Sequence, residues 1–403
     1  MIRPQVESIT LQDHGLWERL RRRRVPLGFD LELTARCNLD CRHCFVNLPA
    51  ADAAAAAREL PAAAVLDLAR QAVDLGAVWC TITGGEPLLR PDFAEIYLGL
   101  KRLGLLVSVY TNATLVRGEH AALFRRYPPR DIEVTVYGAT EETYERITRR
   151  PGSFDRFRRG LGLLLNQGIK VRLKAMALRS NLDGMAEIAR FCREHTKDFY
   201  RFDPLLHLRS DRDPARNAEI LSERLSPAEI ARAERSDPER FGAMERNCER
   251  LIEPRRGDFS LASCLECGER ENCEDLEHLS RLFICGAGAA SFFIAHNASF
   301  RLCASLCAPG MTYDLREGTL KEAWERFAPE IRSRRTGSEA LLGACRSCPI
   351  VNLCFNCPAT ADLECDDPEA LVPYFCAVAH ARLTSLKHEC TPGIGRGTDA
   401  ASE

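Results

Sequence analysis

Short strand-like stretches alternate with helical stretches through the first half of this 403-residue chain. Each strand-like stretch is apolar or alternating, and apolar residues recur at helical spacing in the segments between them. Such alternation predicts a parallel sheet. Six units predict an α/β fold, a partial (β/α)6 TIM-like barrel. The strands are predicted at 29–34, 78–83, 105–111, 132–137, 170–177 and 199–204.

Helices are predicted between these strands and after the last of them. Gly76 follows the first helix and is a suitable terminator for it. The alternation ends near residue 205, where a segment rich in Arg, Glu, Asp and Pro begins. The predicted helices are 60–75, 92–103, 141–148, 154–167, 183–195 and, in that later segment, 227–235.

Unusual residues follow the predicted strands directly. Cys37, Cys41 and Cys44 come after the first strand, and Gly84-Gly85-Glu86-Pro87 follows the second. Asn112 ends the third strand and Tyr137 the fourth. Because a barrel of this kind places its chemistry at the carboxyl ends of its strands, we expect these residues to meet at one mouth.

Three cysteines within eight residues are the first candidate ligand set. A structural zinc site closes with four ligands, whereas three thiolates can hold three irons of a [4Fe–4S] cluster and leave the fourth iron open. An open iron can bind a small molecule. Half of a zinc ribbon, or three buried cysteines, are the alternatives that the motif alone leaves open.

Composition limits the classes of protein that remain. The net charge of −2 argues against a nucleic-acid partner, and we interpret the basic run 21–24 as a solvated lead-in. The chain shows neither a signal peptide nor an apolar run long enough for a membrane span, so we expect a cytoplasmic protein. In a reducing compartment its 19 cysteines favour metal ligation over disulfides.

Fourteen of those cysteines lie between residues 248 and 390. Cys264, Cys267 and Cys273 have a cluster-like spacing that Cys248 could complete, with a thiol-rich loop as the alternative. Zinc ribbons are the alternative for the whole block. Cys80 and Cys192 are expected to be buried apolar residues, and Cys365 and Cys390 to be spectators.

The motifs of the first half together resemble those of the radical S-adenosylmethionine (SAM) enzymes. Cys37-x3-Cys41-x2-Cys44, Gly84-Gly85-Glu86-Pro87 and Thr111-Asn112 carry the resemblance, which covers residues 28–210. It implies a [4Fe–4S] cluster whose open iron chelates SAM. An electron from the cluster then cleaves SAM, and the 5′-deoxyadenosyl radical abstracts hydrogen from the substrate.

The same resemblance implies roles in binding SAM. The Gly84–Glu86 turn would receive the amino group of SAM, with Gly84 and Gly85 allowing close approach and Glu86 adding an acceptor. Phe45 would lie against the adenine, and Asn112 belongs to the same site. Thr135 or Tyr137 would contact the ribose. Arg146 would pair with the carboxylate. Lys174 is a further polar residue expected to point inward.

The C-terminal cysteines resemble the SPASM extension of that family, which carries auxiliary iron–sulfur clusters. By that resemblance Cys345, Cys348, Cys354 and Cys376 hold one auxiliary [4Fe–4S] cluster. Cys285, Cys303 and Cys357 hold the other, and its fourth ligand is Cys273, Cys307 or none, which would leave an open iron. One departure is the spacing of two residues, rather than three, between Cys354 and Cys357.

The expected organisation has five parts. The barrel is followed by a connection and a small Cys-rich irregular α+β domain. The parts are an N-terminal lead-in (1–27), the radical SAM partial barrel (28–210), a bridging segment (211–270), the SPASM-like domain (271–390) and a tail (391–403).

The expected function is hydrogen abstraction from a peptide or protein, in the maturation of a ribosomally synthesised peptide by crosslinking, thioether formation or epimerisation. The first alternative keeps the chemistry but uses a sugar, an amino acid or a cofactor precursor. The second is a non-catalytic iron–sulfur electron carrier. Fewer than 30 residues precede the first strand, so any leader peptide would need a separate binding protein. Ferredoxin or flavodoxin is the expected electron donor.

Overall fold

The computed structural model describes residue 20 and residues 23–197, 200–249, 280–346, 348 and 350–387. Cys264, Cys267, Cys273 and Cys390 therefore lie outside the described residues, as does the predicted tail. Cys248 lies in a described helix, but its side chain is not described.

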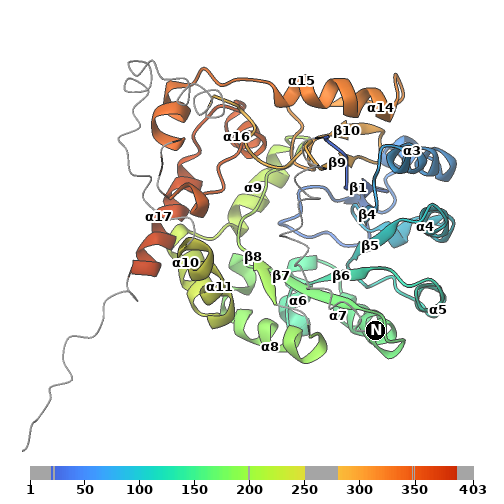
Figure 1. Ribbon diagram of the computed structural model, residues 1–403. Helices are drawn as coiled ribbons and strands as arrows, with labels where there is room; N and C mark the ends of the chain where they lie inside the picture. Colours follow the sequence, from blue (N-terminus) through green and yellow to red (C-terminus); the bar gives the residue numbers. More distant parts are fainter. Residues whose placement is uncertain are drawn as a thin grey trace, which may run out of the picture.

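The six predicted strands are present and run parallel to one another. They neighbour each other in chain order, which confirms the partial (β/α) barrel (Figure 1). They are β1 (Gly28–Glu32), β4 (Trp79–Thr83), β5 (Leu106–Thr111), β6 (Asp131–Val136), β7 (Val171–Met176) and β8 (Arg201–Asp203).

Helices lie on the outer side of this sheet, as Figure 1 shows. The predicted helices are all present, and α2 and α5 are additional helices of the barrel that the sequence did not predict. They are α2 (Ala53–Arg58), α3 (Ala62–Asp74), α4 (Phe93–Arg102), α5 (Gly118–Arg126), α6 (Glu141–Thr148), α7 (Ser153–Asn166) and α8 (Met185–His195).

Local sequence explains where these helices begin, end and pack. In α3 the residues Val65, Leu68 and Ala72 recur on one face and are buried against the sheet. The chain turns out of this helix at Gly76, whose φ of 109° is unfavourable for other residues. Helix α6 begins at Thr140, whose hydroxyl accepts a hydrogen bond from the backbone of Thr143.

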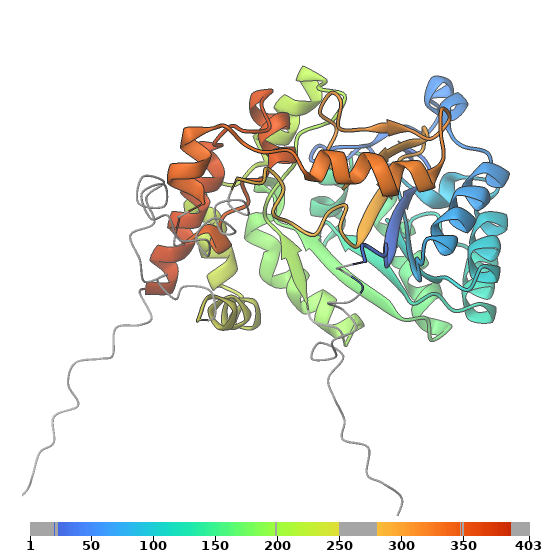
Figure 2. The same cartoon turned by 45° about the horizontal axis from the view of Figure 1, so that its top comes forward.

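Three strands from the C-terminal half extend the same sheet. Strand β9 (Ser291–Ile294) pairs in parallel with β1, and β10 (Ser299–Arg301) and β11 (Tyr313–Asp314) follow in antiparallel pairing. Figure 2 shows β9 beside β1. The Cys-rich half is therefore joined to the barrel through a continuous nine-stranded sheet, a connection that the sequence did not reveal.

Aromatic packing reinforces this junction. The rings of Phe29 in β1 and Phe292 in β9 stack with their centroids 5.4 Å apart, and Trp324 packs on Phe292 at 5.6 Å. The guanidinium of Arg24 lies 5.1 Å from the centre of the Trp324 ring and donates to the Gly288 carbonyl. The interpretation of run 21–24 as solvated is thus wrong for Arg24, because it closes the seam between the two halves.

The segment after the barrel contains helices that pack on the C-terminal half. They are α9 (Pro214–Glu223), α10 (Pro227–Arg235) and α11 (Pro238–Glu249). Helix α10 packs against α17 (Pro373–Lys387), where the buried Arg382 and Glu234 form an ion pair of 2.7 Å. This part of the predicted bridging segment is thus a folded layer.

The remaining elements of both halves are short. Within the described part of the chain no helix is long and apolar enough to cross a membrane. The short elements are β2 (Arg36–Cys37) and β3 (Leu48–Pro49) near the first cysteines, the 3-10 turns η1 (Pro87–Leu89), η2 (Arg179–Gly184) and η5 (Val351–Leu353), the π-helical turns η3 (Ala323–Phe327) and η4 (Leu341–Cys345), and the helices α14 (Leu320–Glu322), α15 (Ala328–Arg332) and α16 (Pro358–Cys365).

Candidate functional site

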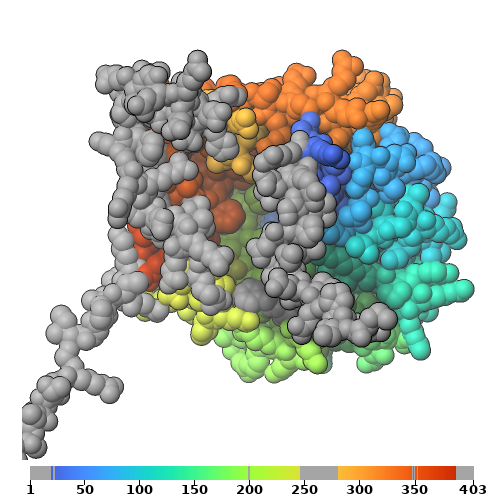
Figure 3. Space-filling view, viewed as in Figure 1, coloured from blue at the N-terminus to red at the C-terminus, as the bar shows by residue number. Residues whose placement is uncertain are grey.

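A cavity of about 810 Å³ opens at the carboxyl ends of the barrel strands. Every one of the six parallel strands contributes a polar residue to its wall, and the β9–β10 region contributes from the other side. Figure 3 shows the orange part of the C-terminal half against the blue N-terminal residues at the molecular surface. The strand residues that line the cavity include Asp30, Thr81, Tyr110, Glu133, Lys174 and Asp203, and the C-terminal half adds Phe293, His296 and Arg301.

The three cysteines of the first motif lie together at one wall of this cavity. Cys37 and Cys41 are only 7% and 5% exposed and form a small apolar cluster with Leu39. Cys44 and Tyr137 pack against that cluster. The structure therefore brings the three thiols together on one loop that faces the cavity.

Burial controls the protonation of these thiols. It raises the pKa of Cys37 to about 12, and the Glu86 carboxylate nearby acts in the same direction. Burial also raises the pKa of Cys41 and Cys44. Because a thiol must be deprotonated to bind a metal, iron would have to displace these protons when it binds.

The cysteine loop supplies the donor type that an iron–sulfur cluster needs. Across the described residues, no three His, Cys, Asp or Glu side chains are placed to hold one metal ion. Three thiols spaced around a larger group are what a cubane with three protein-bound irons needs. The residues present therefore fit the expected [4Fe–4S] cluster.

The glycine turn lies against the backbone that leads into the cysteine loop. The amide of Gly85 donates to the Thr34 carbonyl at 2.7 Å, and that of Glu86 donates to the Arg36 carbonyl at 2.9 Å. A Cβ atom on Gly84 or Gly85 would come within 2.3 Å of a carbonyl oxygen of this backbone. Both glycines also line the cavity, so the turn needs glycine both for packing and for close approach by a ligand.

Glu86 differs from its expected role as an acceptor for SAM. Its side chain is fully buried and does not line the cavity. One carboxylate oxygen accepts from the Leu88 amide at 3.0 Å and the Thr111 hydroxyl at 2.8 Å, and the other accepts from the Asn112 amide at 2.8 Å. Glu86 therefore ties the glycine turn to the end of β5. Burial raises its pKa to about 7 despite these hydrogen bonds.

The other residues predicted to bind SAM divide into two groups. Phe45, Asn112, Thr135 and Tyr137 all line the cavity. Phe45 is 38% exposed and lies edge-on to His207 with the ring centroids 6.1 Å apart.

Arg146 does not belong with these residues. It lies on the outer side of α6, where its guanidinium donates to the Ser180 carbonyl at 2.9 Å and faces Glu142 at 3.4 Å. Arg146 is not among the residues that line the cavity, so its contact with the SAM carboxylate stays a prediction.

Lys174 does point inward, as predicted. Its ammonium group lies 2.6 Å from the carboxylate of Glu133, which also pairs with Arg201. It is 5.0 Å from the centre of the Tyr110 ring. Tyr110, Glu133 and Lys174 form a polar floor from three neighbouring strands.

Several cavity residues were not predicted. His43 lies between the second and third cysteines, is buried, and leaves its Nδ1 without a hydrogen-bond partner. Burial lowers its pKa to about 4, so the imidazole is neutral. Its place inside the cysteine motif was the signal that could have identified it.

A second histidine comes from the C-terminal half. The Nδ1 atom of His296 lies 2.5 Å from the carboxylate of Glu32 at the end of β1. Only the pairing of β9 with β1 brings these two residues together, and no local pattern in the sequence predicts it.

The C-terminal cysteines fall into two neighbourhoods. Cys345 interacts electrostatically with Cys354, Cys348 and Cys376, and burial raises its pKa. Cys303 interacts in the same way with Cys357 and Cys285, and burial raises its pKa to about 11. These are the same two sets that the resemblance implied.

The remaining cysteines lie apart from these sets. The thiol of Cys307 accepts a hydrogen bond from Arg301 at 2.9 Å and interacts with Ser210. Cys80 and Cys192 are buried apolar residues, as predicted, and Cys365 is exposed at the end of α16.

Fold and site together define the class of protein. Residues 31–192 match the model of the radical SAM superfamily. This stretch is a radical SAM domain, and the resemblance seen in its motifs is confirmed.

Two curated relatives show how far the similarity extends. The AdoMet-dependent heme synthase of Methanosarcina barkeri is 25% identical over 85% of this chain and 94% of its own length. The subtilosin biosynthesis protein AlbA of Bacillus subtilis is 30% identical over 42% of this chain and 37% of its own length. Apart from the Methanosarcina barkeri enzyme, the chain spans between 37% and 56% of the length of the curated relatives that it matches.

Solved structures extend the likeness to the C-terminal half. Streptococcus suis SuiB bound to its precursor peptide SuiA superposes with a TM-score of 0.62 at 19% identity, covering 88% of this chain and 77% of SuiB. Similarity at this level of identity concerns the fold. Because it covers 88% of the chain, this similarity extends beyond residues 31–192.

Proposed function

We propose that the protein cleaves SAM reductively at a [4Fe–4S] cluster held by Cys37, Cys41 and Cys44 and abstracts hydrogen from a peptide or protein substrate. The cluster, when bound, supplies one electron that breaks the S–C5′ bond of SAM, giving methionine and a 5′-deoxyadenosyl radical that takes a hydrogen atom from the substrate.

One observation carries the proposal: the three thiols and the Gly84–Gly85 turn face the same cavity. A ligand of the open iron would therefore lie beside backbone that only glycine allows it to approach. Phe45, Asn112, Thr135 and Tyr137 line the rest of that end of the cavity and are the proposed contacts for SAM. Glu86 supports this region by holding the glycine turn against Asn112.

Protein residues would also position the substrate and exclude water. The floor formed by Tyr110, Glu133 and Lys174 and the pair of Glu32 and His296 face the cavity from opposite sides. Such fixed polar groups orient a bound molecule and can hold or move a proton at a carboxylate or imidazole.

The auxiliary ligands follow from the two C-terminal neighbourhoods. Cys345, Cys348, Cys354 and Cys376 would hold one auxiliary [4Fe–4S] cluster, and Cys285, Cys303 and Cys357 the other. The fourth position of the second cluster falls to Cys273 or Cys307, or remains open to substrate. The pairing of Cys307 with Arg301 favours Cys273 or an open iron.

A peptide substrate is supported by the relatives of the fold. SuiB has been solved with its precursor peptide, and AlbA acts in the biosynthesis of the bacteriocin subtilosin. The proposed partners are a precursor peptide, a separate small protein that binds its leader, and ferredoxin or flavodoxin as the electron donor. The proposed location is the cytoplasm.

One observation favours the alternative of a small-molecule substrate. The heme synthase matches this chain over 94% of its own length, whereas AlbA matches over 37% of its own. A cofactor precursor would then occupy the cavity in place of a peptide.

Anaerobic reconstitution with iron and sulfide, followed by dithionite and SAM, tests the radical chemistry. We expect 5′-deoxyadenosine as a product, measured by liquid chromatography and mass spectrometry. A fully loaded protein that yields none would contradict the proposed activity and leave the electron-carrier alternative.

The choice of substrate requires a second experiment. Short peptides encoded beside the gene and porphyrin precursors should be incubated separately with the loaded enzyme and SAM. A mass change in a peptide supports the proposal, whereas a mass change confined to the porphyrins supports the alternative.

A further inference from the structure

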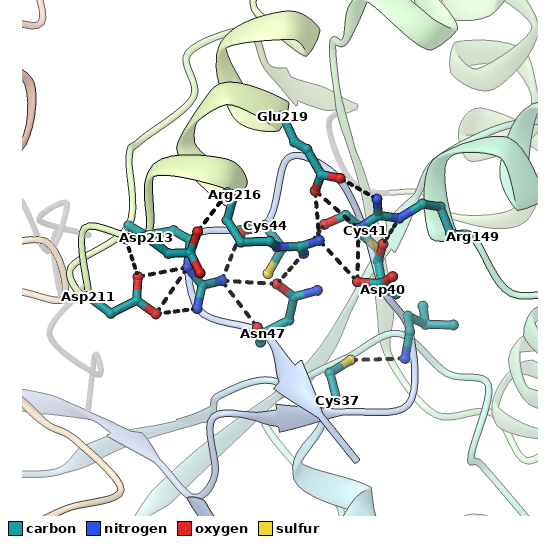
Figure 4. Close-up of polar contacts among 12 residues, drawn as sticks. Cys37, Asp40, Cys41, Cys44, Asn47, Arg149, Asp211, Asp213, Arg216 and Glu219 are labelled. Atoms are coloured by element: carbon teal, nitrogen blue, oxygen red, sulfur yellow. Dashed lines mark hydrogen bonds and ion pairs between the residues drawn. The ribbon is translucent and has the colours of Figure 1, made fainter. Parts of the chain in front are cut away.

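The loop that carries the first cysteines is bonded by arginines from elsewhere in the chain. Figure 4 shows arginines grouped beside Cys41 and Cys44 together with Asp40, Asn47 and Glu219. They come from α9, from the turn before it and from the end of α6. The hydrogen bonds from these arginines to the cysteine loop connect residues between 109 and 175 positions apart in the chain.

Arg209 binds the end of the loop. It is only 3% exposed, and one of its nitrogens donates to the Cys44 carbonyl at 3.4 Å and to the carbonyl and side-chain oxygens of Asn47 at 3.1 and 3.2 Å. Asp211 holds the other side of the guanidinium at 2.6 Å. The ion pair with Asp211 thus fixes the orientation in which the Arg209 guanidinium faces the loop.

Arg216 binds the middle of the loop. It donates to the Cys41 carbonyl at 3.2 Å and to the Asn47 side chain at 3.0 Å. It also pairs with Asp40 at 3.2 Å and with Glu219 at 2.7 Å. Asn47 therefore accepts hydrogen bonds from both arginines.

Arg149 completes the network at the end of α6. It donates to the Asp40 carbonyl at 2.7 Å and pairs with Glu219 at 2.5 Å. The arginine and acidic residues of the network are equal in number: Arg149, Arg209 and Arg216 against Asp40, Asp211 and Glu219.

Arg209 and Arg216 act on the Cys44 thiol through their charge, whereas the hydrogen bonds of the network act on the geometry of the loop. The bonds of the network go to backbone carbonyls and to the Asn47 side chain, and Arg209 and Asn47 themselves line the cavity. The thiols of the loop are left facing inward. A hydrogen bond from a charged donor to a buried acceptor is also costly to lose.

We infer that Arg209 and Arg216 are positioning residues for the cluster-binding loop, and that their bonds to Cys41, Cys44 and Asn47 set the geometry of the SAM-binding iron. The inference rests on the proposed cluster at Cys37, Cys41 and Cys44. It does not depend on which substrate the enzyme uses.

The same segment provides a matched control. Arg212 lies between the two positioning arginines, but it faces α16, where it pairs with Asp362 at 2.9 Å and with Asp366. Replacing it removes one arginine from the segment without touching the cysteine loop.

The test compares Arg209→Gln, Arg216→Gln, Arg216→Lys and Arg212→Gln in the full chain after anaerobic reconstitution. The readouts are iron per chain and the electron paramagnetic resonance spectrum of the reduced protein with and without SAM. SAM should perturb a cluster whose iron it coordinates, so this change reports on the first site.

We expect Arg209→Gln and Arg216→Gln to weaken the SAM-dependent spectral change about tenfold or more, or to lose about four irons per chain, because charged hydrogen bonds to the loop are removed. Arg216→Lys should recover part of the change, and Arg212→Gln should match the wild type.

Two results would overturn the inference. One is a wild-type spectrum and iron content in both Gln variants. The other is an equal loss in Arg212→Gln, which would show a general effect of the segment. A wild-type protein that binds its full iron but produces no 5′-deoxyadenosine would contradict the proposed activity, while the comparison of iron and spectra among the variants would still decide the inference.

Discussion

The first cysteine site and the C-terminal cysteine sites are built on opposite principles. Cys37 and Cys41 come from one buried loop. The glycine turn bonds the backbone that leads into it, and Arg216 bonds the Cys41 carbonyl. The C-terminal ligands come from segments between residues 285 and 376, and Cys285 and Cys376 are exposed. The first set is therefore largely buried and held by bonds from distant segments, whereas part of the C-terminal set reaches the surface.

The largest effect is expected from replacing the cysteines of the two sites. Replacing Cys37, Cys41 or Cys44 by Ala should lower the formation of 5′-deoxyadenosine about 10³-fold or more, because the electron donor to SAM is lost. Replacing Cys345 or Cys348 should spare part of it. Quantitative mass spectrometry of 5′-deoxyadenosine measures both, and equal losses in the two groups would contradict a division of roles.

Replacing a glycine by alanine in each region should show that the first cysteine site tolerates an added Cβ less well than the C-terminal sites. In Gly85→Ala the new Cβ would lie 2.3 Å from the Arg36 carbonyl, and backbone cannot easily move away. We expect a loss of about 3 kcal/mol in stability, near the upper end for overpacking.

Gly286, beside the exposed Cys285, is the matched position in the C-terminal half. A Cβ there would meet no atom within 4 Å, so Gly286→Ala should be nearly neutral. Thermal unfolding of the metal-free proteins, followed by circular dichroism, tests the difference. A lower midpoint for Gly286→Ala than for Gly85→Ala would show that the first region is not the more rigid one.

The pH dependence of the metal-free protein should show the cost of burial at the first site. The pKa of Glu86 is raised to about 7, so the folded state binds more protons than the unfolded state above about pH 4.5. The stabilising contribution is present below that pH and is lost as the pH rises through about 7. We expect Glu86 to contribute a decrease of about 2 kcal/mol between pH 5 and 7.

Glu86→Gln isolates this contribution, because the amide does not titrate. Melting curves across that pH range should have a smaller slope in the variant than in the wild type. Identical slopes would mean that Glu86 is already ionised in the folded protein.

The smallest effects sharpen the boundary of the SAM site. Phe45→Ala removes part of the cavity wall and should weaken SAM binding about threefold to tenfold through lost apolar contact. Arg146→Ala removes only a surface pair and should change it less than about twofold. Equilibrium dialysis with SAM under anaerobic conditions compares them, and a larger effect for Arg146 would restore its predicted role.

Sequence reasoning worked where the signal was local. The bounds of α6 and α10, the order of the six parallel strands and the position of the cysteine and glycine motifs all followed from periodicity and turn residues. The contacts of Arg146 with Ser180 and Glu142 could not be predicted, because a helix position alone does not say what a side chain meets.

Residues brought in by tertiary contacts could not be predicted in the same way. Arg209 and Arg216 lie in a segment that is rich in charge, and nothing in their spacing indicates that they face a cysteine loop more than 160 residues earlier. His296 reaches Glu32 only because β9 selects β1 as its partner. Such choices depend on the packing of the whole chain.

The pairing of β9 with β1 also has a consequence for biosynthesis. Strand β1 emerges from the ribosome about 260 residues before β9, so its open edge waits for most of translation before it is covered. An uncovered strand edge can pair with another chain. The barrel cut off after residue 210 should therefore aggregate, and chaperones would have to protect the nascent chain until its last third is made.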